Sequence, residues 1–144
     1  MNLFGMLELS GMALVAERQR AEVVASNMAN AETTRTPEGG PYQRRLVVFR
    51  SRRLPQFPAL LAGMRQNAGQ GVLVDQVVRD VTNPVRRYEP GHPDADAKGY
   101  VAYPSINPVE EMTDLLGAVR AYELNASAVQ ASKMMIQQAI EILR

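Results

Sequence analysis

One continuous stretch decides the fold of this chain, residues 107–144, which reads NPVEEMTDLLGAVRAYELNASAVQASKMMIQQAIEILR. Asn107 can cap a helix, Pro108 suits the first helical position, and acidic residues follow where the positive end of the helix dipole lies. After the cap, apolar side chains recur at alternating steps of three and four residues, which is typical of a coiled-coil-like helix. This seam consists of Met112, Leu115, Val119, Tyr122, Ala126, Val129, Lys133, Ile136, Ile140 and Leu143.

The rest of this helical surface is unusually short of charge. Between residues 124 and 140, Lys133 is the only charged residue, whereas a solvated helix usually carries charged pairs. From Pro108 to Arg144 the helix would be about 55 Å long, which exceeds the roughly 30 Å of a compact domain of this size. The pattern predicts a helix that is covered on more than one side, although periodicity alone also fits an ordinary core helix of one small domain.

The N-terminal segment shows the same period less cleanly. Gly5 and Gly11 each weaken a helix by up to about 1 kcal/mol relative to alanine, so this helix should be marginal alone. It therefore needs a partner, and the C-terminal helix is the obvious one. The apolar row expected to face partners contains Leu3, Leu7, Leu14, Ala21, Val24 and Met28.

The positions of the prolines separate the two ends from the middle. All nine lie between residues 37 and 108, and the middle combines turn signals with short strand-like runs. We expect an α+β fold in which long N- and C-terminal helices form a coiled-coil-like pair with a small β-rich middle domain. The expected divisions are a helical arm at 1–31, a β-rich middle at 32–106 with a loop at 51–70, and a helical arm at 107–144. The expected strands are residues 42–50, 71–82, 85–88 and 100–103.

Few residues could support catalysis. The chain has no cysteine and one histidine, so thiolate chemistry and a disulfide framework are excluded. His92 with Asp94 and Asp96 could be drawn as a metal site, but a second histidine is missing, and a turn in which the carboxylates bind nearby backbone N–H groups explains the pattern. No glycine-rich phosphate loop or serine elbow is present. We expect a protein that is not an enzyme and holds no metal or cofactor.

Net charge does not indicate a partner, because sixteen basic and fifteen acidic residues leave +1. The basic surplus lies in the middle and could contact phosphates, yet a recognition helix and a dense aromatic platform are missing. We expect no nucleic acid and instead acidic neighbours, such as the arms of adjacent copies. Charges interrupt the N-terminal arm, so neither a signal peptide nor a membrane span is expected. The basic cluster comprises Arg35, Arg44, Arg45, Arg50, Arg52, Arg53 and Arg65.

Two motifs carry a resemblance to a known family. The first has two asparagines three residues apart at the end of the first expected helix, followed by a Thr-Pro-Gly-Tyr-like turn, and it resembles the N-terminal signature of bacterial flagellar rod and hook proteins. The second, within residues 84–107, is similar to the proximal-rod type of that family, as is the C-terminal helix. The motif residues are Asn27, Asn30, Thr36, Pro37, Tyr42, Tyr88, Pro90, Gly91, His92, Pro93, Gly99 and Tyr100.

The resemblance implies a structural subunit of the bacterial flagellar basal-body rod, in its proximal part, that polymerises through its terminal helices and transmits torque. Its partners would be copies of itself, other flagellar rod subunits, the flagellar export apparatus and a membrane-ring adaptor. It would reach the periplasm-spanning rod by type III export from the cytoplasm without a cleavable signal. The alternative is a soluble, non-catalytic binding module that uses the helix pair and the arginine-rich loop.

Overall fold

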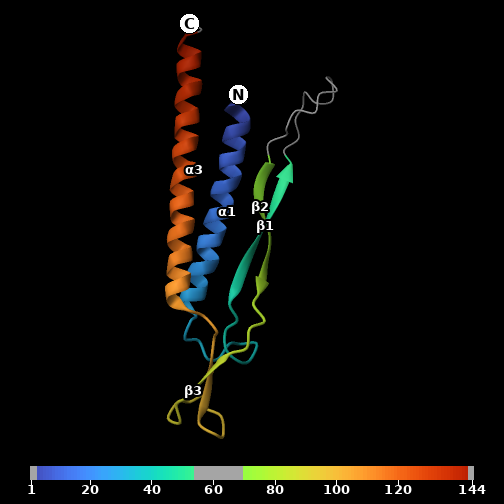
Figure 1. Ribbon diagram of the computed structural model, residues 1–144, viewed down its shortest axis with the longest axis vertical. Helices are drawn as coiled ribbons and strands as arrows, with labels where there is room; N and C mark the ends of the chain where they lie inside the picture. The colour runs from blue at the N-terminus through green and yellow to red at the C-terminus, as the bar shows by residue number, and fades with distance from the viewer. Residues whose placement is uncertain (1–2, 54–69, 143–144) are drawn as a thin grey trace.

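The computed structural model describes residues 3–53 and 70–142 of the chain. Figure 1 shows two long helices side by side and antiparallel, with two small β-ribbons. The expected α+β fold with long terminal helices is confirmed. Residues 54–69 of the expected loop and Leu143 of the expected seam lie outside the described residues. The elements are, in order, α1 (Leu3–Ala29), β1 (Arg45–Arg53), β2 (Gln70–Arg79), β3 (Val85–Tyr88), β4 (Tyr100–Tyr103) and α3 (Pro108–Ile142).

The first ribbon is the antiparallel pair of β1 and β2. Its register runs from Arg45 opposite Arg79 to Arg53 opposite Gln70, with an irregularity between Val48 and Phe49. Both strands contact α1, and Figure 1 shows α1 lying between this ribbon and α3. The helix pair and the ribbon therefore form three successive layers with α1 in the middle.

The second ribbon is the antiparallel pair of β3 and β4, in which Val85 lies opposite Tyr103. Figure 1 shows this ribbon beyond the end of the helix pair at which α1 ends and α3 begins. All four residues of β3 are exposed, and Pro84 and Pro90 flank the strand closely. β4, in contrast, buries Val101 and Tyr103, so the second ribbon is a short extension of the molecule whose buried side chains come from β4.

The start of α3 follows the capping signal in the sequence. The side-chain Oδ1 of Asn107 accepts a hydrogen bond from the backbone N–H of Val109 at 3.1 Å, and its Nδ2 donates to Oε1 of Glu110 at 3.1 Å. These bonds satisfy a backbone donor that the first turn of a helix leaves unpaired. The expected cap at Asn107 is confirmed.

The face of α3 that is buried does not coincide with the apolar seam. Its buried residues are Glu111, Ala118 and Ser132, which repeat every seven or fourteen positions. Met112 and Val119 follow two of them by one residue, a rotation of about 100° around the helix, and both are exposed. Small and polar side chains therefore line the buried face of α3, and much of the apolar seam stays on the surface.

The expected strands of the middle are all present, but the bounds of the first one differ from those expected. Residues 85–88 and 100–103 form β3 and β4 as expected, and β2 covers most of the expected 71–82. The expected strand at 42–50 is wrong at its start, because β1 begins only at Arg45. The backbone N–H of Tyr42 donates to the carbonyl oxygen of Thr33 and not to β2, while the side chains of Tyr42 and Arg44 bind the two helices.

Candidate assembly interface and its polar junction

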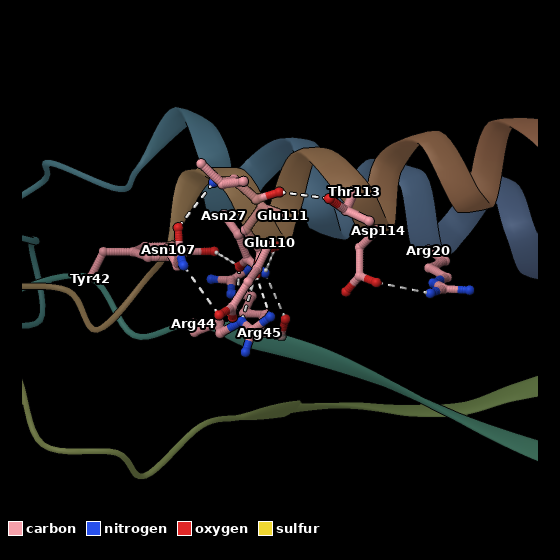
Figure 2. Close-up of polar contacts among 11 residues, drawn as sticks. Arg20, Asn27, Tyr42, Arg44, Arg45, Asn107, Glu110, Glu111, Thr113 and Asp114 are labelled. Atoms are coloured by element: carbon pink, nitrogen blue, oxygen red, sulfur yellow. Dashed lines mark hydrogen bonds and ion pairs between the residues drawn. The ribbon is translucent and has the colours of Figure 1, made fainter.

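A cluster of polar side chains joins α1, the start of β1 and the first turns of α3. We call these five residues the polar junction: Asn27, Tyr42, Arg44, Arg45 and Glu111. Figure 2 shows them converging from the two helices and the strand. Asn27 and Glu111 are each only 1 % exposed, which is rare for an amide and a carboxylate unless they are fully paired.

Asn27 binds the backbone of β1 as a neighbouring strand would. Its Nδ2 donates to the carbonyl oxygen of Arg45 at 2.8 Å, and its Oδ1 accepts from the N–H of Arg45 at 2.9 Å. Two residues that face each other in an antiparallel sheet exchange the same two bonds. The side chain of one helical residue therefore attaches the first ribbon to the end of α1.

The remaining hydrogen-bonding capacity of Asn27 is also used. Its Nδ2 donates a second bond to Oε2 of Glu111 at 3.0 Å, and its Oδ1 accepts a second bond from the hydroxyl of Tyr42 at 3.1 Å. A primary amide offers two donors and two acceptor sites, so this buried group is fully satisfied. A residue without both functions would leave partners unpaired at this position.

Glu111 carries the buried negative charge of the junction. Its Oε1 accepts a hydrogen bond from Nε of Arg44 at 2.6 Å, while its Oε2 is held by Asn27. The side chain of Arg44 is 22 % exposed, so the cation reaches from the surface toward the buried carboxylate. Removing one partner of such a pair leaves an uncompensated charge and is strongly destabilising.

A second polar link joins the helices one to two turns further along. Arg20 of α1 lies 3.3 Å from Oδ1 of Asp114 in α3 and 3.7 Å from Oε2 of Glu17. Oε2 of Glu17 is buried and makes no hydrogen bond. Because Arg20 lies between these two carboxylates, it balances their charge at the boundary of the helix pair.

The second asparagine of the family motif has a different role. Nδ2 of Asn30 donates to the carbonyl oxygen of Ser26 at 2.8 Å, and its Oδ1 accepts from Oγ1 of Thr33 at 3.2 Å. These local bonds close the last turn of α1. Thr36 then closes the turn that contains Pro37 by pairing its N–H with the carbonyl of Gly40 at 2.8 Å.

The other motif residues lie at the second ribbon. The rings of Tyr88 and Tyr100 meet edge to face with centroids 5.3 Å apart. Gly99 has a φ of +80°, and a Cβ there would come within 2.9 Å of the Tyr88 ring, so glycine is required for two reasons. Pro90 lies on the same side, 3.2 Å from that Cβ position.

His92 stands in the turn between β3 and β4, with Gly91 and Pro93 on either side. Its Nδ1 accepts a bond from the N–H of Asp94 at 3.1 Å, and its ring lies edge-on to Tyr103. The Tyr103 hydroxyl donates to Glu89 at 2.8 Å, and this bond raises the pKa of Tyr103. The turn is thus organised by internal contacts of its polar groups.

The acidic residues near His92 also have partners within the chain. Asp94 accepts from the hydroxyl of Thr34 at 2.8 Å, and Asp96 accepts from the backbone N–H groups of Lys98 and Tyr100. Within residues 3–53 and 70–142, no group of three or more histidine, cysteine or acidic side chains is placed to hold a metal ion. Over the same residues, no helix is long and apolar enough to cross a membrane.

Several arginines of the basic cluster are paired inside the chain. Arg44 binds Glu111, Arg50 lies 3.2 Å from Asp75, and Arg35 lies 3.6 Å from Asp94. The guanidinium of Arg45 lies over the ring of Tyr42, 5.7 Å from its centroid. The side chains of Arg53 and Arg65 lie outside the described part of the chain.

The residues expected to form an assembly interface are placed along the helix pair at very different depths. Val24 is buried between the elements, whereas Met112, Val119, Tyr122 and Ile140 are exposed. Leu3 opens α1, and Leu143 follows the last described residue. The intermediate positions, which are half-buried, are Leu7, Leu14, Ala21, Met28, Leu115, Ala126, Val129 and Ile136.

Other large apolar side chains on the helices are also exposed. Phe4 and Val15 of α1 are 74 % and 67 % exposed, and Val109 and Leu116 extend the exposed stripe of α3 that contains Met112. The 35 residues of α3 span about 52 Å and the 27 of α1 about 40 Å. Figure 1 shows the end of α3 extending beyond the start of α1.

The sequence pattern did not identify two members of the junction in these roles. Glu111 was interpreted as a charge favourable to the helix dipole, and Arg44 as one of several surface arginines. The sequence nevertheless contained a signal for this pairing. The asparagine motif at the end of one helix and the glutamate in the first turn of the other both lie in segments that resemble the same family. Their pairing depends on contacts between residues 84 positions apart, which periodicity does not report.

Comparison with known proteins adds an independent line of evidence. Residues 7–35 match the family model described as flagella basal body rod protein, and residues 97–142 match that described as flagellar basal body rod FlgEFG protein C-terminal. The chain is 38 % identical to a flagellar basal-body rod protein FlgC of Borreliella burgdorferi, with 100 % of this chain and 99 % of the relative covered. It is 40 % identical to the Bacillus subtilis protein of that name, with 99 % of each chain covered, and 35 % identical to one from Escherichia coli O157:H7, with 99 % and 98 % covered.

Proposed function

The chain belongs to the FlgC family of flagellar basal-body rod proteins and is a structural subunit of the rod, and from this premise we propose that it polymerises through its two terminal helices. The observation that carries the proposal is the row of exposed apolar side chains on α3, formed by Val109, Met112, Leu116 and Val119. Burying such side chains against a neighbour is favourable by roughly 25 cal/mol per Å² of apolar surface.

Phe4 and Val15 on α1 are exposed as well, so both helices offer apolar surface to neighbours. Contacts between different surfaces of identical subunits do not have to close into a ring and can produce a helical polymer. We propose that the neighbours are copies of this chain and other rod subunits. Because the chain belongs to the rod family, we prefer this interpretation of the exposed helices to that of a soluble binding module.

Membership in the rod family supports a more detailed proposal. We propose that the subunit transmits torque through the proximal, periplasm-spanning part of the rod, without catalysing a reaction. We further propose that it leaves the cytoplasm through the flagellar type III export apparatus and contacts an adaptor at the membrane ring. Localisation of the tagged full chain in intact basal bodies, and its absence from them in an export-deficient strain, would support the export step, and cross-linking of the chain to a membrane-ring protein would support the adaptor contact.

Adjacent residues of α3 provide a matched test of polymerisation. Met112→Asp introduces a charge into the exposed apolar row, whereas Thr113→Asp introduces the same charge one residue later on another exposed face. Both lie near the start of α3, so the effect on the helix dipole is the same. We expect Met112→Asp to abolish incorporation into basal bodies and motility, and Thr113→Asp to preserve both. Normal rods in cells with Met112→Asp would contradict the proposal.

A further inference from the structure

We propose that the polar junction is a rigid joint in which Asn27 is the positioning residue that fixes the angle between the first ribbon and the helix pair. The proposal rests on the proposed torque-bearing function, since a subunit that passes load from one part to another needs a stiff connection between those parts. The joint itself is a property of the single chain and can be tested without the rod.

The first argument is the site at which Asn27 binds. Arg45 is the first residue of β1, and both of its backbone groups are bonded to the side chain of Asn27. Two parallel bonds to one residue restrict rotation of the strand about the contact, whereas a single bond would permit it. Asn27 therefore sets a direction for the ribbon in addition to holding it.

A second attachment lies toward the other end of the same ribbon. Gly71 of β2, which pairs with Arg52, is buried against α1. A Cβ on Gly71 would lie 2.7 Å from Sδ and 2.8 Å from Cε of Met12, so the strand approaches the helix as closely as a side chain permits. One attachment would act as a pivot, but two attachments at opposite ends fix the angle of the ribbon along α1.

The third argument is the buried charge between the helices. Glu111 is held by Asn27 from α1 and by Arg44 from the segment that leads into β1. Moving either element away would leave a buried carboxylate with one partner, which is strongly unfavourable. This one carboxylate therefore links all three elements, so load applied to the ribbon reaches both helices.

The amide is essential to this arrangement. Asn27 must donate to Glu111 and to the Arg45 carbonyl while accepting from the Arg45 N–H and the Tyr42 hydroxyl. A carboxylate at this position would lack the donors and would lie against Glu111. The matched control is Asn30, whose side chain makes only local bonds at the end of α1 among the contacts that the described residues show.

Distances between spin labels provide the test. Because the chain has no cysteine, labels attach only to the cysteines that are introduced. Labels at Gln76→Cys in β2 and Gln130→Cys in α3 measure the distance between the first ribbon and α3. Labels at Gln19→Cys in α1 and Gln130→Cys measure the distance between the two helices. All three positions are exposed. We expect Asn27→Ala to broaden the first distance distribution while the second stays narrow and helix content by circular dichroism is retained. Asn30→Ala should leave both distributions narrow.

Amide exchange in the wild-type chain tests the joint without any variant. The Arg45 N–H should be protected, and Asn27→Ala should accelerate its exchange by about tenfold through loss of one hydrogen bond. An unprotected Arg45 amide in the wild type, or unchanged distances in Asn27→Ala, would overturn the proposal.

The joint and the polymerisation function fail separately. Met112→Asp should leave both distance distributions narrow, since Met112 lies outside the junction. Cells with Asn27→Ala should form rods but swim more slowly than cells with Asn30→Ala, and equal swimming would contradict the load-bearing role. Narrow distances together with normal rods in Met112→Asp would contradict polymerisation through α3 and leave the joint supported.

Discussion

Nε of Arg44 lies 2.6 Å from Oε1 of Glu111, although 67 residues separate the two in the chain. The contact joins the segment that precedes β1 to the first turn of α3. It also gives a carboxylate that is 1 % exposed its partners, because the guanidinium and the Asn27 amide replace the water that it has lost. The stability of the fold should therefore depend on this pair more than on the ion pairs at the surface.

A double-mutant cycle measures that dependence. Arg44→Gln should lower the free energy of unfolding by about 3 kcal/mol because it leaves the buried Glu111 carboxyl without its cationic partner. Combined with Glu111→Gln the loss should be smaller than the sum of the single losses, with a coupling of about 1–3 kcal/mol measured by urea unfolding. The exposed pair of Arg50 and Asp75 is the control and should show a coupling below about 1 kcal/mol. Equal coupling for both pairs would contradict the buried role of Glu111.

The second ribbon depends on the glycine at its turn. Gly99→Ala should lower the free energy of unfolding by more than the roughly 1–2 kcal/mol of a left-handed backbone, because the new Cβ also meets the Tyr88 ring. Gly91→Ala, where a Cβ would meet open space, should change stability by less than about 0.5 kcal/mol. Thermal unfolding of the two variants compares them directly, and the argument fails if both behave alike.

The same turn contains a group whose protonation should be visible at low pH. The backbone N–H groups of Tyr100 and Lys98 bind Oδ1 of Asp96 and hold the pKa of that carboxyl below its usual 3.8. A lowered pKa in the folded state means that the ionised form stabilises the fold above pH 3.8, and this contribution is lost as the pH falls through the lower folded value. Carboxyl NMR should give a midpoint below 3.8 in the wild type. Asp96→Asn should remove this part of the acid dependence, and a midpoint at or above 3.8 would contradict the geometry.

The sequence predicts the two helices well because their signals are local and repeated. The cap at Asn107, the proline at the first helical position and the absence of later prolines define α3 without reference to the rest of the chain. The short strands β3 and β4 were also expected at their observed bounds, since turn residues delimit them on both sides.

The face of α3 that packs in the chain could not be predicted in this way. Two rows one residue apart share the seven-residue period, and hydrophobicity favours the row that contains Met112 and Val119. In the structure the buried row contains Glu111 and Ala118, because the pairing of Glu111 with Asn27 fixes the rotation of the helix and the small side chain allows close approach. Long-range hydrogen bonds of this kind leave no periodic signal.

The observed start of β1 differs from the expected start at residue 42 for a related reason. Tyr42 and Arg44 belong to a run with strand composition, so a pattern extends the strand over them. The backbone N–H of Tyr42 instead donates to the carbonyl oxygen of Thr33 at 3.0 Å. The paired strand begins only at Arg45, although the carbonyl oxygen of Arg44 already accepts from the N–H of Asp80 at 2.8 Å. A local pattern cannot distinguish a strand residue from one whose backbone is extended to reach a distant partner.

The two prolines beside β3 have a consequence for how such a protein behaves at high concentration. An exposed strand edge invites another chain to pair with it, which is a common route to aggregates. Only alternate residues of a four-residue strand direct N–H groups outward, and Pro84 and Pro90 supply none at its ends. β3 is therefore too short to pair with a strand of another chain, and aggregation through strand pairing should be rare even at high protein concentration.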